Sequence, residues 1–111
     1  MDHALQEFKA DFFRALAHPA RIRLLETLVD GERTVQDLQS VLSLDQSAVS
    51  QHLAVLRHKN IVSAQKVGTT VRYALRDPLL AELLDTARQI FDRHLVGTQG
   101  LLRELRRERV R

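Results

Sequence analysis

Two short helical segments joined by a tight connection, and followed directly by a β-hairpin, constrain the fold of this chain most strongly. Residues 34–42 begin with Thr34-Val35-Gln36-Asp37, which has the pattern of a capping box, and their apolar residues recur at helical spacing. Only Ser43-Leu44-Asp45, which offers Ser43 and Asp45 as N-caps, separates this segment from a second one that reaches about residue 58. This order matches the helix-turn-helix arrangement over residues 34–58.

The residues after this motif predict a hairpin and a closing helix. Residues 61–67 and 70–76 are rich in β-branched side chains and flank Gly68-Thr69, which is typical of two paired strands. We therefore expect a wing over residues 61–76. Asp77-Pro78 then suits the start of a long helix over residues 78–108.

The rest of the chain predicts two further helices in a single domain. Residues 1–17 carry a helical apolar stripe, and Pro19 suits the first position of the next helix. Gly97 and Gly100 are positions at which the closing helix could bend or divide. With 111 residues there is room for one modest core. We expect one domain over residues 1–111, mainly α with a β-hairpin wing: a winged helix-turn-helix of order α-α-α-α-β-β-α.

The helix that begins near Gln46 has an outward face suited to reading DNA bases. At 100° per residue its apolar side chains cluster on one side. The opposite side carries Ser47, Ser50, Gln51, Ala54 and His58. Glutamine pairs with adenine, serine bonds to several bases, and alanine contacts the thymine methyl. We predict that Ser47, Ser50 and Gln51 read bases, with Gln46 as a weaker candidate; the alternative is an ordinary solvated face.

Basic residues surround this face. Arg57 lies near the end of the same helix, and Lys66 and Arg72 project from the hairpin, where they are candidates for phosphate contacts. The chain has 17 Lys and Arg against 14 Asp and Glu, a net charge of +3. Each cation taken singly is better explained by solvation, but the modest surplus and the joint arrangement of these cations around a polar helix face favour a polyanionic partner, such as double-stranded DNA.

Four segments of the chain together resemble the ArsR/SmtB winged-helix repressors. The resemblance rests on FFRALAHPARIRLL over 12–25, TVQDL over 34–38, QSAVSQHLAVL over 46–56 and KVGTTVRY over 66–73. It implies a homodimer that binds an inverted-repeat operator and releases it when an effector binds. It also implies that the first and last helices, over 1–17 and 78–108, form the dimer.

Apolar residues on both terminal helices suit such an interface. The candidates are Leu5, Phe8, Phe12, Leu84, Ile90 and Phe91. The same stripes could pack within one chain, so they favour a dimer only mildly.

The metal ligands common in this family have no counterpart here. The resemblance places the thiolate pair at Thr34 and Gln36, and the chain has no cysteine. It places the ligands of the interfacial zinc site at Asp77, Leu79, Ile90 and Arg93, of which only Asp77 is a usual zinc ligand. We therefore expect no metal site and no cofactor at these positions.

Two histidines leave a metal-responsive alternative open. His3 and His94 lie on the terminal helices, which could meet in a dimer, and could form an unconventional nickel or copper site. His18, at a helix boundary before Pro19, is expected to be structural, and His52 is expected to pack with one hydrogen bond. The effector and the operator sequence are not given by these residues.

Other classes of function fit poorly. The chain has no phosphate-binding glycine loop, nucleophile elbow or plausible triad, so an enzyme is not expected. No signal peptide or apolar stretch of membrane length is present, so we expect a cytoplasmic protein with no membrane partner. A winged helix used only for protein interaction is an alternative, but its exposed helix face should be apolar or acidic.

Overall fold

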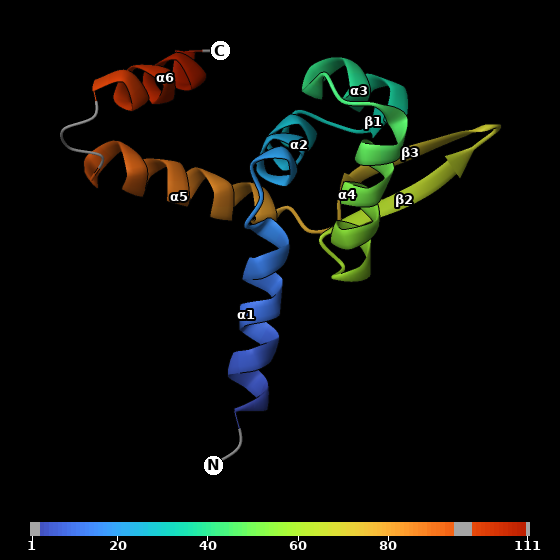
Figure 1. The fold of residues 1–111 in the computed structure, drawn as a ribbon, viewed down its shortest axis with the longest axis horizontal. Coiled ribbons are helices and arrows are strands. Elements are labelled where there is room, and N and C mark those ends of the chain that lie inside the picture. The colour runs from blue at the N-terminus through green and yellow to red at the C-terminus, as the bar shows by residue number, and fades with distance from the viewer. Residues whose placement is uncertain (1–2, 95–98, 111) are drawn as a thin grey trace. The chain divides into compact units, whose positions relative to one another are not determined.

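The computed structural model describes residues 3–94 and 99–110, and it contains two compact units with a boundary after Pro78 (Figure 1). The first unit contains α1 (Ala4–Leu16), α2 (Pro19–Val29), β1 (Arg33–Thr34), α3 (Val35–Leu42), α4 (Gln46–His58), β2 (Val62–Val67) and β3 (Thr70–Leu75). The second contains α5 (Leu79–His94) and α6 (Gln99–Val110). The mainly helical fold with a hairpin wing is therefore confirmed.

Local hydrogen bonds explain where the helix-turn-helix elements begin and end. The predicted capping box is confirmed, because the Asp37 amide donates to Thr34 Oγ1 and the Thr34 amide donates to the Asp37 carboxylate. Ser43 ends α3 in the left-handed region, at φ 55°. Asp45, rather than Ser43, is the N-cap of α4, and accepts a 2.8 Å hydrogen bond from the Ala48 amide.

The wing belongs to a small three-stranded sheet. The strands are antiparallel in the order β1-β3-β2, and the turn between β2 and β3 contains Gly68 at φ 64°. The two-residue strand β1 was absent from the predicted element order, because two residues are too few to show an alternating pattern. It pairs Arg33 with Tyr73 and Thr34 with Arg72, so it ties the start of α3 to the wing.

The core of the first unit is aliphatic and joins α2, α3, α4 and the start of β2. The buried apolar residues are Ala15, Leu24, Leu25, Leu28, Leu38, Leu42, Val49, Leu53, Leu56, Ile61 and Val62. No buried polar residue occurs among the described parts of the chain. The predicted inward stripe of α4 is confirmed, and its burial orients the rest of that helix toward solvent.

The closing segment differs from the single long helix that the sequence predicts. Within residues 79–94 and 99–110 it forms two helices, α5 and α6, and the Arg88 Nε and Glu108 Oε2 atoms lie 3.6 Å apart between them. Gly100 lies inside α6 and does not break it, whereas Gly97 lies outside the described residues. The single domain over 1–111 stays a prediction. None of the helices, over the residues described, could cross a membrane.

Candidate nucleic-acid interface

The side of α4 that faces away from the core carries the four residues predicted to read bases. Gln46, Ser47, Ser50 and Gln51 are all exposed, whereas Val49, Leu53 and Leu56 on the opposite side are at most 1% exposed. Ser47, Ser50 and Gln51 lie within one arc of the helix, and Gln46 lies at its flank in the first turn. The structure therefore brings these side chains together on one uncharged polar face.

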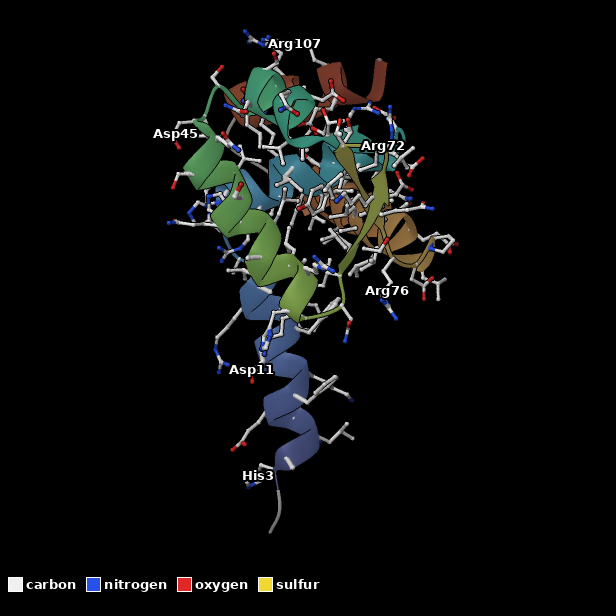
Figure 2. All side chains as sticks on the ribbon, turned by 90° about the vertical axis from the view of Figure 1, so that its right-hand side faces the viewer. His3, Asp11, Asp45, Arg72, Arg76 and Arg107 are labelled. Atoms are coloured by element: carbon white, nitrogen blue, oxygen red, sulfur yellow. The ribbon has the colours of Figure 1, made fainter. Side chains whose placement is uncertain are left out.

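Helix α4 and the wing lie side by side on one side of the first unit, toward the viewer in Figure 2. Asp45 marks the start of the helix and Arg72 lies on the wing. The amino end of a helix carries partial positive charge, which favours phosphate groups. Arg57, Lys66 and Arg72 are all exposed, as a role in phosphate binding requires.

A shallow hollow connects the reading helix with the wing. It is lined by Ser50, Leu53, Ala54, Arg57, His58 and Tyr73. Tyr73 was not among the predicted site residues. Alternation along β3 could have found it, because a half-buried tyrosine next to the reading helix offers a hydroxyl to a phosphate or a base.

The strand register places the two wing cations on different faces of the sheet. Lys66 pairs with Val71, so it shares the face of Tyr73, two residues along β3. Arg72 pairs with Gln65 and lies on the opposite face. Lys66 is thus on the side of the wing that borders the hollow, whereas Arg72 is turned from it.

Arg72 lies near the carboxyl group of Asp37, which is part of the capping box of α3. The backbone and the hydroxyl of Thr34, which hydrogen bond to this carboxyl, lower its pKa, and the charges of Arg33 and Arg72 lower it further. The ionised carboxylate secures the capping box at the start of α3. The effect of Arg72 is the smallest of those that lower this pKa.

The six residues predicted for the dimer interface lie on α1 and α5, in separate units. Phe8 is 73% exposed, and Ile90 and Phe91 are each 51% exposed. Leu5 is exposed as well, while Phe12 and Leu84 are half-buried, and the Phe12 ring packs edge-on against Phe13 at 5.4 Å. Both helices thus offer large apolar side chains to solvent in the single chain.

The residues at the positions of the family's metal ligands either have another structural role or are exposed. Thr34 caps α3, and Leu79, Ile90 and Arg93 are exposed on α5. Within residues 3–94 and 99–110, as far as side chains are described, no three His, Cys, Asp or Glu side chains gather to hold a metal ion. His3 is exposed at the start of α1, and the side chain of His94 lies outside the described part.

The three-helix core, the exposed polar face of α4 and the adjoining hairpin define a winged helix-turn-helix regulator. Comparison with known proteins then gives the family. Residues 18–64 match the family described as bacterial regulatory protein, arsR family. Over 103 residues the chain is 44% identical to the HTH-type transcriptional regulator Rv0081 of Mycobacterium tuberculosis, covering 92% of this chain and 90% of that protein. The chain belongs to the arsR family of bacterial regulatory proteins.

Solved structures agree with this assignment. The crystal structure of M. tuberculosis Rv0081 has a TM-score of 0.79 at 46% identity, covering 82% of this chain and 92% of that one. NolR from Sinorhizobium fredii has a TM-score of 0.75 at 35% identity, covering 80% and 89%. Mb0332 from Mycobacterium bovis, a homodimeric winged helix-turn-helix DNA-binding domain, has a TM-score of 0.78 at 28% identity, covering 86% and 90%. Like the relatives that are named as transcriptional regulators, the chain is a transcriptional regulator of the arsR family.

Proposed function

We propose that this protein is a homodimeric repressor that binds an inverted-repeat operator in double-stranded DNA, in the cytoplasm. The observation that carries the proposal is the exposed, uncharged polar face of α4, formed by Ser47, Ser50 and Gln51. A face of this kind suits base edges in the major groove, where small polar side chains can donate and accept hydrogen bonds. A protein-interaction module would be expected to expose apolar or acidic residues here instead.

The cations around this face support contacts to the phosphate backbone. Arg57 lines the hollow beside α4, and Lys66 lies on the bordering face of the wing. Arg72 stays a candidate on the other face, where a wing tip seated on the backbone would bring it close to a second phosphate. We propose that these three residues position the protein and that α4 reads the sequence.

The dimer is supported by the apolar side chains that α1 and α5 expose. Burial of a phenylalanine such as Phe8 contributes roughly 1.5–3 kcal/mol, which favours association through these helices. Mb0332 is described as homodimeric, which agrees with this assembly. Two reading helices of a symmetric dimer enter major grooves about one helical turn apart.

Selection of tight binders from a library of random-sequence DNA duplexes tests this function. We expect the selected duplexes to share two inverted half-sites whose centres lie about 10 base pairs apart, or a multiple of that distance. Selection of no common sequence would overturn the repressor proposal. Selection of a single half-site would overturn the dimeric mode of binding.

Removing a wing cation should weaken binding to all sequences alike. We expect Lys66→Ala and Arg72→Ala each to lower the affinity for selected and scrambled duplexes by a similar factor, and to reduce the salt dependence of log K by about two, one for each protomer of the dimer. Titrations at several salt concentrations measure both quantities. Arg76→Ala is the matched control, because Arg76 is exposed beyond the opposite end of β3 and its loss should leave the salt dependence unchanged. A change in base preference in either wing variant would contradict the assignment.

We further propose that zinc, cadmium and arsenite do not release the operator. A ligand shifts an equilibrium only when it binds one state more tightly than the other, and the residues at the family's ligand positions supply too few metal donors for this. Adding each ion to tag-free protein on the selected duplex should therefore leave the affinity unchanged. Release by stoichiometric zinc would refute this, and release by nickel that disappears in His94→Ala would favour the alternative His3 and His94 site.

A further inference from the structure

Three side chains connect α1, α2 and the middle of α4. The Nε atom of Arg21 donates a 2.7 Å hydrogen bond to the carbonyl oxygen of Ala15, near the end of α1. The Nη1 atom of Arg21 lies 3.4 Å from Nδ1 of His52 on α4. The His52 ring packs against the His18 ring with 4.5 Å between their centroids. His18 in turn caps α2, because its Nδ1 accepts a 3.0 Å hydrogen bond from the Ala20 amide.

The directions of these hydrogen bonds fix the charge state that the cluster requires. A guanidinium can only donate, so Nδ1 of His52 is the acceptor, and the neutral ring carries its proton on Nε2. His18 also accepts through Nδ1, so its ring cannot carry a proton on that atom. The cluster therefore holds together with one positive charge, that of Arg21, and two neutral imidazoles.

His52 lies on the helix that reads DNA, but on its inner side. It follows Gln51 directly, and it lies at the edge of the buried stripe formed with Val49 and Leu53. A displacement of His52 would consequently move the outward residues of the same rigid helix, Ser50 and Gln51 among them.

We propose that Arg21 and His52 are positioning residues for DNA recognition, which hold α4 against the ends of α1 and α2 only while His52 is neutral. The proposal rests on the proposed function. It adds two residues that touch no base or phosphate to those that determine affinity. It also assigns a role to His52, which the proposed DNA contacts leave unexplained.

The surroundings of His52 favour its neutral form. Burial lowers the pKa of His52 below its ordinary value, and the positive charge of the neighbouring Arg21 lowers it further. Arg21 lies on α2 and His18 is the N-cap of that helix, and no carboxylate from α1, α3 or β2 is among the groups that act on His52 within the described residues. Protonation would remove the acceptor and place a second positive charge beside Arg21, so acid should open the cluster.

The dependence of DNA affinity on pH tests this role. As the pH falls below the pKa of His52, one proton must leave before α4 can regain its position. Because a dimer carries one His52 in each of its two reading helices, the Kd of the wild type for the selected duplex should therefore rise by up to about a hundredfold per pH unit relative to that of His52→Gln, about tenfold for each half-site. Glutamine keeps an acceptor for Arg21 but does not titrate. Titrations between about pH 7.5 and 5.5 at fixed ionic strength measure this ratio, which cancels proton uptake shared by both proteins.

His3→Gln is the matched control, because it removes an exposed histidine from the start of α1 and should keep the wild-type dependence on pH. A Kd ratio of wild type to His52→Gln that does not change with pH would overturn the proposal. So would loss of the pH dependence in His3→Gln.

A measurement on the protein without DNA tests the role of the cluster independently of DNA binding. Because the pKa of His52 is lowered in the folded chain, the stability from its neutral form is complete above about pH 6.5 and is lost as the pH falls through the folded value. Amide hydrogen exchange of the wild type, corrected for intrinsic rates, should show that acid lowers protection more in α4 than in α3. Equal changes in both helices would overturn the positioning role, even if His52→Gln does not fold. If no duplex is selected, the proposed function is wrong, but hydrogen exchange still tests whether the cluster positions α4.

Discussion

Replacing Phe8 with glutamate is expected to convert the dimer into folded monomers and to weaken operator binding by about a hundredfold or more, because the two half-sites are no longer read together. Phe8 is 73% exposed in the single chain, so the new carboxylate would stand in water and the fold should survive. Within a dimer interface the same carboxylate would be buried without a partner, at a cost that association cannot offset. Light scattering gives the oligomeric state, and circular dichroism gives the helical content.

Gln6→Glu is the matched control for this substitution. It also adds one negative charge to an exposed position of α1, but about 160° around the helix from Phe8. We expect it to remain dimeric and to bind DNA as the wild type does. Phe91→Glu on α5 should behave like Phe8→Glu. A Phe8→Glu protein that stays dimeric would contradict the interface, and a wild type that is monomeric at micromolar concentration would remove the dimer altogether.

The fold could be predicted largely because its elements begin and end at residues with distinct local chemistry. Thr34 and Asp37 form the predicted capping box, and Pro19 begins the helix that it was expected to begin. The spacing of Val49, Leu53 and Leu56 correctly predicted which side of α4 is buried. Because one side is buried, the exposure of Ser50 and Gln51 followed from the sequence as well.

The remainder depends on contacts that sequence spacing does not encode. Strand β1 exists because Arg33 and Thr34 pair with β3, and a two-residue strand has no pattern of its own. Tyr73 joins the site through the register of the wing, which also separates Lys66 from Arg72. His18 was correctly expected to be structural, but its contact with His52 joins residues far apart in the chain.

The central claim is that the outward face of α4 reads bases. A substitution of Gln51 tests this claim most directly. Replacing Gln51 with alanine should lower the affinity of the dimer for the selected duplex by about thirtyfold to ten-thousandfold, because a good pair of hydrogen bonds to one base contributes roughly 1–3 kcal/mol in each of the two half-sites. The loss should be confined to one base pair in each half-site. Gln6→Ala removes another exposed glutamine, on α1, and should leave the affinity unchanged.

The decisive measurement is the Kd of wild type and Gln51→Ala for the selected duplex and for duplexes that differ from it at one base pair in each half-site. We expect the wild type to discriminate at every position of the half-site, and Gln51→Ala to lose discrimination at one position and keep it at the others. If Gln51→Ala binds the selected duplex as tightly as the wild type and retains the same preference at every position, the assignment of this face of α4 to base reading is wrong.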